Sequence, residues 1–375
     1  MTIAVVGTST WNKGAELMQV AIAEHLRDKD PSIHVAVQPH FGTFEDRARH
    51  GAFLLVPPFR PGRTRLGMSL LPGSFRRSFG VVTEDEVDVV IDASGFAFGD
   101  QHPLKRSLDF AREVERWQKL GKPVILLPQA FGPFDQPEMR AAFARIMRAA
   151  TLIYARDPVS YEYAREVAGE TKKLRMAPDF TNLVKPLAPE ELGSINRACI
   201  VPNQRMIEKA PTRKAADAYV PLFGALIRAV SSHGVEPVLM IHGDHDAPVV
   251  EMVQEQLGCT LPVIRERDPV RIKADLGRSR VVIASRFHAL VSALTQGVPA
   301  IATSWSHKYE MLFEDYGCPN LLLPSGAGPE QASVAVDRVL GPERSQICAT
   351  IKERGRSVSN RVNEMWREID AALGL

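Results

Sequence analysis

The chemically most informative residues are two cationic side chains at the point where a predicted strand enters a helix. Arg286 and His288 flank Phe287 directly after the apolar run RVVIAS. An arginine binds phosphate or carboxylate through two parallel charge-assisted hydrogen bonds, and a helix N-terminus favours an anion. A histidine beside it holds or donates a proton near neutral pH. Because Ser-His-Lys at 306–308 adds a basic edge one strand further on, we predict an anion site here.

Polar side chains follow other predicted strands as well. Asn12 and Glu16 stand in the strand-to-helix turn GTSTWNKGAE, where either side chain can bind a hydroxylated ligand or serve the turn alone. Gln129 lies in LLPQAFGPF, just before a rigid Gly-Pro turn, and is a candidate for recognising hydroxyl groups. Arg156 ends the next strand and either enters the site or forms a salt bridge with a neighbouring helix.

The loop IHGDHD at 241–246 has the composition of a metal site. Two histidines and two aspartates follow a strand, but no matching set of ligands occurs downstream. The loop is therefore a hydrogen-bonding edge of the site or a solvated turn, and we predict no metal.

Strand-length apolar runs alternate with longer amphipathic stretches along the chain. The first half has such runs at 3–7, 87–95, 123–129 and 151–156, with helical patterns such as 14–28 between them. Runs that do not alternate polar and apolar residues are typical of parallel strands covered on both faces. This alternation of strands and helices predicts an α/β fold with doubly wound sheets.

The rhythm is interrupted once, at the proline-containing segment 177–193, and then restarts with ACIVP at 198–202. We predict two Rossmann-like domains, 1–185 and 190–345, that face a central cleft as in the GT-B architecture. A long amphipathic helix from about Ser345 to Leu373, within 346–375, is expected to pack back on the first domain.

Bulk composition excludes several classes of protein. The 375 residues carry a formal net charge of +2, which is too near balance for a nucleic-acid binder. The N-terminus lacks the pattern of a signal peptide, and no run reaches the roughly 18 apolar residues of a membrane span. The four cysteines show no zinc-site spacing. We expect a cytoplasmic protein with reduced thiols.

One segment departs from the α/β rhythm. Residues 51–80 carry five arginines and no acid, interleaved with Phe, Leu, Met, Pro and Gly. This composition fits an ordinary insertion beside the site, or a basic loop that contacts an anionic acceptor or the inner membrane face.

Taken in order, several motifs together resemble the polysaccharide pyruvyl transferase family. They are NKGAE, LLPQAFGPF, YARDPVSYEYA, MAPDF, VPNQR, SRFHALVSALTQGVPAIA and SHKYEMLFEDYG, and they span most of the chain. The resemblance implies transfer of a pyruvyl group from phosphoenolpyruvate to two hydroxyls of a sugar, which leaves a cyclic pyruvate ketal and phosphate. The acceptor is then a sugar or a lipid-linked saccharide, and the scheme demands no cofactor.

The resemblance also implies roles for individual residues. It carries the donor site and catalysis to Arg286 and His288, and the weaker match VPNQR adds Arg205. From their own types and positions, we expect Asn12, Glu16, Gln129 and Arg156 to bind the acceptor. The full set of residues expected to bind the donor is Arg286, His288, Arg205, Lys308, Asn203 and Ser306.

The chain departs from the family pattern at two places. Ala15 stands where relatives often have Asp, and Ser94-Gly95 stands where they often have Gly-Gly. Two other functions remain open at this stage. One is a GT-B glycosyltransferase that uses a nucleotide sugar, and the other is a non-catalytic sugar-binding relative.

Overall fold

The computed structural model describes residues 1–56, 71–186, 195–303 and 306–375. The chain divides into two compact units. Unit 1 comprises Met1–Trp11, Met18–Phe180 and Glu364–Leu375, and unit 2 comprises Asn12–Leu17 and Thr181–Asn363. Residues 12–17 lie within the predicted first domain, but they cluster with unit 2.

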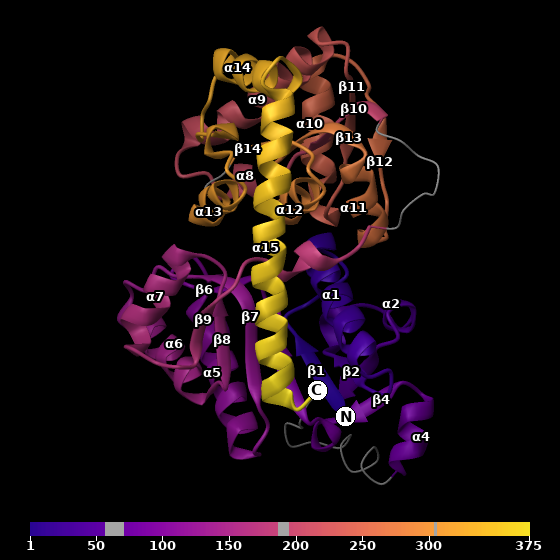
Figure 1. Cartoon of the computed structure of the whole chain (residues 1–375), viewed down its shortest axis with the longest axis vertical. Helices are drawn as coiled ribbons and strands as arrows, with labels where there is room; N and C mark the ends of the chain where they lie inside the picture. Colours follow the sequence, from indigo (N-terminus) through magenta and orange to yellow (C-terminus); the bar gives the residue numbers. More distant parts are fainter. Residues whose placement is uncertain (57–70, 187–194, 304–305) are drawn as a thin grey trace. The chain divides into compact units, whose positions relative to one another are not determined.

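Unit 1 contains a parallel sheet with the strand order β4-β3-β2-β1-β5-β7-β8-β9, and β6 pairs with β7 beside this path. Its strands are β1 (Thr2–Val6), β2 (His34–Val37), β3 (Phe53–Val56), β4 (Val81–Thr83), β5 (Val89–Asp92), β6 (Phe96–Phe98), β7 (Val124–Phe131), β8 (Leu152–Ala155) and β9 (Leu174–Met176). Figure 1 shows them in the indigo-to-magenta part of the chain.

The connections of unit 1 are mostly helical. The helices are α1 (Lys13–Lys29), η1 (Pro39–Phe41), α2 (Phe44–Arg49), α4 (Gly73–Ser78), η2 (Glu84–Glu86), α5 (Leu104–Lys119), α6 (Pro137–Ala149), α7 (Pro158–Ala168) and η3 (Phe180–Leu183). Two of them cross the unit boundary, since the start of α1 up to Leu17 and the part of η3 from Thr181 onward belong to unit 2.

The direction of winding reverses beside β1. The chain builds β1 to β4 toward one edge of the sheet, then returns to place β5 on the other side of β1. In the register of the two pairings, Ala4 is flanked by Ala36 of β2 and Val90 of β5. Small and β-branched residues suit this centre because both faces of the sheet are covered. Ligands of such sheets bind at the carboxyl ends of the strands at this reversal.

Unit 2 repeats the design with a six-stranded parallel sheet of order β12-β11-β10-β13-β14-β15. Its strands are β10 (Ile195–Val201), β11 (Glu236–Met240), β12 (Val263–Ile264), β13 (Ser279–Ala284), β14 (Ala300–Thr303) and β15 (Leu322–Leu323). Here the winding reverses between β10 and β13, where Ile200 pairs with Ile283. The prediction of two doubly wound Rossmann-like domains is confirmed.

The helices of unit 2 connect these strands and complete the chain. They are α8 (Arg205–Glu208), α9 (Arg213–Ser232), η4 (Asp244–Asp246), α10 (Ala247–Leu257), α11 (Pro269–Gly277), α12 (Phe287–Thr295), α13 (His307–Asp315), η5 (Pro319–Leu321), α14 (Pro329–Leu340) and α15 (Arg344–Leu373).

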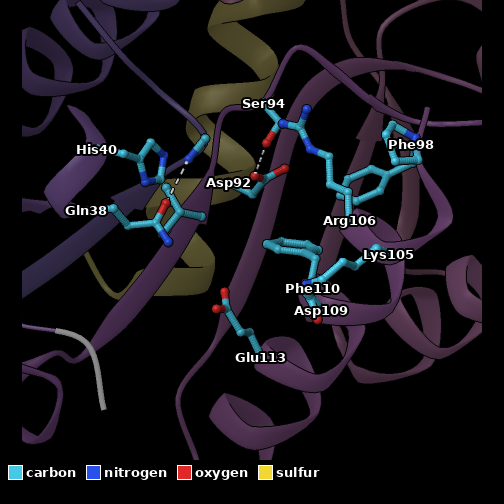
Figure 2. Close-up of a pocket in the computed structure, with 13 residues that line it drawn as sticks. Gln38, His40, Asp92, Ser94, Phe98, Lys105, Arg106, Asp109, Phe110 and Glu113 are labelled. Carbon is cyan, nitrogen blue, oxygen red and sulfur yellow. Dashed lines mark hydrogen bonds and ion pairs between the residues drawn. The ribbon is translucent and has the colours of Figure 1, made fainter. Parts of the chain in front are cut away.

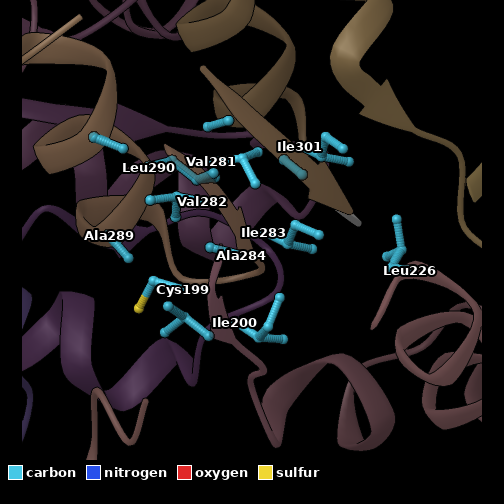
Figure 3. Packing of buried hydrophobic residues seen from close by; sticks show 14 of the residues in the cluster. Cys199, Ile200, Leu226, Val281, Val282, Ile283, Ala284, Ala289, Leu290 and Ile301 are labelled. Atoms are coloured by element: carbon cyan, nitrogen blue, oxygen red, sulfur yellow. The ribbon is translucent and has the colours of Figure 1, made fainter. Parts of the chain in front are cut away.

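The core of unit 2 centres on β10 and β13. Cys199 and Ile200 lie beside Val282 and Ile283, with which they pair in the sheet, and Figure 3 shows them with Leu290 of α12 and Ile301 of β14 in the same buried cluster. Burial raises the pKa of the Cys199 thiol to about 12, so this cysteine stays protonated and serves as a small apolar side chain. This core fixes the two strand ends that carry the site described below.

The C-terminal helix, predicted at Ser345–Leu373, runs as α15 from Arg344 to Leu373 and is the long yellow helix of Figure 1. Its last residues belong to unit 1. There Trp366 stacks on His25 with ring centroids 4.0 Å apart, and Asp370 accepts from His25 Nε2 at 2.8 Å and pairs with Lys29 at 2.7 Å. These contacts attach the chain's end to α1.

Residues 57–70 of the predicted basic loop lie outside the described residues. The described end of that segment forms α4, whose Arg76 and Arg77 both pair with Glu86, at 2.8 and 2.9 Å. In the part of the chain that the structure describes, no helix is long and apolar enough to cross a membrane.

Candidate active site

The candidate site lies at the carboxyl ends of β10, β11 and β13, where the winding of unit 2 reverses. The end of β13 is held by a buried network around Ser285. Its carbonyl oxygen accepts from Asn203 Nδ2 and from Tyr309 Oη, each at 2.9 Å. Its hydroxyl lies 2.9 Å from Tyr219 Oη and 2.8 Å from Thr303 Oγ1. These hydrogen bonds fix the backbone at Ser285 and therefore the position from which the side chain of the next residue, Arg286, extends.

Arg286 is clamped by a buried carboxylate. It occupies the N-cap of α12, its Nε donates to Asp246 Oδ2 at 2.8 Å, and its Nη2 donates to Asp246 Oδ1. Asp246 is fully buried and also accepts from the backbone amides of Gly243 and Gln204, each at 3.1 Å. The fork is bidentate, so the guanidinium plane is fixed. Its third nitrogen, Nη1, has no hydrogen-bond partner among the described residues.

His288 lies in the first turn of α12 and is in very close contact with Gly14. A Cβ atom built on Gly14 would lie 2.2 Å from Nδ1 and 2.6 Å from Cγ of the imidazole. Glycine is therefore required for steric reasons, since any side chain at this position would displace the ring. The segment NKGAE thus packs directly against SRFHA.

The same N-terminal segment brings further polar groups to the site. Asn12 forms an antiparallel bridge with Gly243, and its Oδ1 accepts from the amide of Gly14 at 3.1 Å. Lys13 and Glu16 are both buried and form an ion pair of 2.7 Å. Asn12 and Glu16, which were predicted on the acceptor side, thus lie in unit 2 with Arg286 and His288.

His242 is the buried imidazole of this cluster. Its side chain is 3% exposed, and its pKa is well below the usual range, first because of burial and then because Arg286, His288 and Lys13 lie nearby. It is therefore neutral near pH 7. The site gathers cationic and neutral donors and balances two of the cations with buried carboxylates.

The other predicted donor residues lie on the adjoining segments. Asn203 is buried and serves the Ser285 network, with its Oδ1 accepting from the Arg205 amide at 3.0 Å. Arg205 itself is exposed and pairs with Glu208 at 3.3 Å. Ser306 is the N-cap of α13, and Lys308 Nζ lies 5.5 Å from the ring centroid of Phe287.

The sequence now places this arrangement among known proteins. The model of the family described as polysaccharide pyruvyl transferase matches residues 12–307, a range that includes Asn12, Arg286 and His288. The chain belongs to the polysaccharide pyruvyl transferase family. No curated protein sequence matches it.

This pyruvyl transferase family member is also similar to solved structures over its full length. MnaA of S. aureus in complex with UDP is 11% identical, with a TM-score of 0.61 and coverage of 100% of this chain and 97% of that one. HepE of Anabaena in complex with UDP-glucose is 16% identical, with a TM-score of 0.58 and coverage of 100% and 99%. The spinosyn rhamnosyltransferase SpnG is 15% identical, with a TM-score of 0.56 and coverage of 99% and 100%. The likeness shows the GT-B type of fold.

Two predicted acceptor residues belong to unit 1. Gln129 is fully buried in β7 and donates through Nε2 to Asp92 Oδ2 at 2.7 Å. Arg156 is buried and pairs with Asp179 at 3.3 Å. Arg156 therefore forms a salt bridge, with the segment before η3 rather than with a helix.

Three residues of the cluster were not among the predicted site residues. They are Lys13, His242 and Asp246. The signal for the last two was present in the loop IHGDHD, and the structure shows that this loop is a hydrogen-bonding edge of the site. Within the described ranges no group of three or more His, Cys, Asp or Glu side chains is arranged to hold a metal ion.

Proposed function

We propose that the protein transfers a pyruvyl group from phosphoenolpyruvate to two hydroxyls of a sugar and releases phosphate. The observation that carries the proposal is the clamp of Arg286 by buried Asp246, with His288 two residues further on, in the first turn of α12. A guanidinium held in one orientation is prepared for an anion, because little of its freedom remains to be lost on binding.

Phosphoenolpyruvate presents two anionic groups, a phosphate and a carboxylate. In our proposal Arg286 binds one of them through Nη1, and the N-terminus of α12 adds backbone N–H groups and a favourable dipole. Arg205 and Lys308 bind the other group from the neighbouring segments. His242 supports this arrangement, because a neutral imidazole donates or accepts a hydrogen bond without adding a further charge.

His288 is the proposed acid and base. Protonated His288 gives a proton to the methylene carbon of the donor, which becomes a methyl group, and the first sugar hydroxyl attacks the cationic central carbon. The C–O bond to phosphate then breaks, and the phosphate leaves with the proton of that hydroxyl. The second hydroxyl attacks the same carbon, its proton returns to His288, and the ketal ring closes. Each atom and proton is accounted for, and the histidine is regenerated.

A second candidate function is transfer of a sugar from a nucleotide sugar. It is favoured by the likeness to HepE, whose structure contains UDP-glucose, and a helix N-terminus with an arginine suits a diphosphate equally well. A non-catalytic relative would bind phosphoenolpyruvate without consuming it. Binding of UDP-sugars rather than phosphoenolpyruvate would indicate the sugar transferase. Binding of phosphoenolpyruvate without turnover would indicate the non-catalytic relative.

Phosphorus-31 NMR tests the proposed reaction directly. Phosphoenolpyruvate is incubated with the protein and a panel of saccharides, and the appearance of inorganic phosphate is followed together with a new methyl signal in the proton spectrum. Saccharide-dependent formation of both signals is the expected result. Phosphate without the ketal methyl group would indicate hydrolysis, and phosphoenolpyruvate that binds but remains intact would favour the non-catalytic relative.

We further propose that the reaction occurs in the cytoplasm, with peripheral contact to the inner membrane face through residues 51–80. In the described part of this segment, Phe75 and Phe79 are 50% and 62% exposed, with ring centroids 4.9 Å apart. Exposed aromatic rings suit the boundary of a lipid headgroup region. Sedimentation with anionic phosphatidylglycerol vesicles tests this contact. Binding that is lost in Phe75→Ser/Phe79→Ser supports it, and equal sedimentation of both proteins contradicts it.

A further inference from the structure

Unit 1 contains a pocket of its own at the reversal of its sheet. The pocket has a volume of about 540 Å³, within the range of small-molecule sites. It is lined by residues that follow β1, β2 and β5 and by one face of α5 (Figure 2). This is the position at which a doubly wound sheet binds its ligand, between the strands on either side of the switch in direction.

One of the residues that line this pocket is a buried acid. Asp92, the last residue of β5, is fully buried by its neighbours, and its two oxygens accept from Ser94 Oγ at 2.6 Å and Gln129 Nε2 at 2.7 Å. Burial raises its pKa, and these hydrogen bonds and Arg106 oppose that rise. A carboxylate has about four acceptor positions, so each oxygen retains capacity for another donor.

The lining of the pocket carries two cations and three acids: Lys105, Arg106, Asp92, Asp109 and Glu113. Lys105 and Asp109 pair at 2.5 Å. Burial raises the pKa of Glu113, and burial together with Arg106 lowers the pKa of His40, so the neutral form of both is favoured and the remaining charges balance. Arg106 has no ion pair or side-chain hydrogen bond among the described residues, and Figure 2 shows it reaching from α5 toward Ser94 and Asp92. An electrically balanced, polar pocket selects for a neutral ligand rich in hydroxyls.

One wall of the pocket is aromatic. Phe98 and Phe110 have ring centroids 5.2 Å apart, and both line the cavity. A pyranose has one face of C–H groups and a rim of hydroxyls, so it can cover such a wall while its hydroxyls reach Asp92, Gln38 and His40. Apolar walls with a few placed polar groups are the usual design of small-molecule sites.

We propose that this pocket binds an uncharged saccharide, with the Asp92 carboxylate accepting a hydrogen bond from a sugar hydroxyl and Arg106 donating to a neighbouring oxygen. The identification of that saccharide as the pyruvyl acceptor rests on the proposed function. The binding assignment does not, because it depends only on residues of unit 1.

The assignment is tested by saturation-transfer NMR and calorimetry with neutral probes. The probes are the methyl glycosides of glucose, galactose, mannose and N-acetylglucosamine and their β-linked disaccharides, with methyl glucuronide as the acidic comparison. At least one neutral probe is expected to bind the wild type. Asp92→Asn weakens it by about tenfold or more, since a hydrogen bond to a charged acceptor is lost. Asp28→Asn, at an exposed site on α1, is the matched control and leaves binding unchanged.

Stability distinguishes this role from a structural one. The amide introduced by Asp92→Asn retains the shape of the side chain and removes the cost of a buried charge. The variant is therefore expected to keep or raise the melting temperature at pH 7 while losing the saccharide. A lowered melting temperature with unchanged affinity would identify Asp92 as structural and overturn the proposal. Arg106→Ala, at an exposed position, weakens the same probe in a second, independent variant.

The remaining outcomes are also decisive. Binding of the glucuronide alone, or of no probe, would overturn the assignment of a neutral saccharide. Phosphoenolpyruvate is titrated in parallel. A wild type that binds a neutral glycoside but not phosphoenolpyruvate would retain the pocket and refute the proposed function, and the reverse result would refute only the pocket.

Discussion

The imidazole of His288 fills the space that a side chain on residue 14 would occupy. A Cβ atom at Gly14 would lie 2.2 Å from His288 Nδ1, and real Cβ atoms do not approach a neighbour so closely. Two segments separated by more than half of the chain are thereby fitted to one another. The absence of a side chain at Gly14 therefore determines the position of His288, the proposed acid and base.

Gly14→Ala is therefore expected to displace His288 and lower turnover by roughly 100-fold, as misplacement by about 1 Å can do. Donor affinity changes little, because Arg286 is held by Asp246 rather than by this contact. The rate of phosphate release and the calorimetric affinity for phosphoenolpyruvate are measured together. Gly328→Ala is the control, since a Cβ atom at Gly328 meets no atom within 4 Å. Unchanged turnover in Gly14→Ala would show that the imidazole position is not critical.

Asp246→Asn tests whether the buried carboxylate orients Arg286. The substitution leaves the guanidinium without its charge partner in a buried setting, so we expect a loss of about 3 kcal/mol in the free energy of unfolding. We also expect weaker binding of phosphoenolpyruvate. Urea unfolding and calorimetry give the two quantities. Asp244→Asn changes an exposed acid of the same loop and should alter neither one. A variant with unaltered donor affinity would remove Asp246 from the site.

His242 predicts how stability depends on pH. Its pKa is lowered in the folded protein, so the folded state favours the neutral ring, and the unfolded chain takes up the proton first as the pH falls. The stabilisation is complete above the unfolded pKa of about 6.5 and is lost below it, by up to about 1.4 kcal/mol per pH unit.

His242→Gln should accordingly flatten the decline in stability between pH 7 and pH 5. Urea unfolding at several pH values measures the slope for wild type, for His242→Gln and for His245→Gln, which changes an exposed histidine of the same loop. Part of the slope remains in each variant, because the pKa of His40 is also lowered. Parallel curves for wild type and His242→Gln would contradict the neutral, buried imidazole.

Much of the fold followed from the sequence alone. Unalternating runs of Val and Ile marked parallel strands, and the interruption near residues 177–193 separated two sets of them. The sequence also placed Arg286 and His288 where a strand ends and a helix begins, and they lie at the N-cap and in the first turn of α12. In both cases the local sequence pattern was enough to predict the local structure, and the anion site at this turn stays a prediction.

Contacts between residues far apart in the sequence could not be predicted from local sequence patterns. Asp246 and Arg286 are 40 residues apart and meet because β11 and β13 flank β10 in the sheet, an order that apolar runs do not encode. Asn12 and Glu16 were predicted, together with Gln129 and Arg156, on the acceptor side in the first domain. The bridge from Asn12 to Gly243 groups the first two with unit 2. The pocket around Asp92 was missed for the same reason.

The central claim is that Arg286 is the anchor for phosphoenolpyruvate. The most direct measurement is calorimetric titration of wild type and Arg286→Ala with phosphoenolpyruvate, and of wild type with UDP, UDP-glucose and inorganic phosphate. We predict that phosphoenolpyruvate binds the wild type in preference to the nucleotides, and that Arg286→Ala loses at least about tenfold in affinity, or about 1.4 kcal/mol. Equal affinity of the two proteins for phosphoenolpyruvate, or a wild type that binds only UDP compounds, would contradict it.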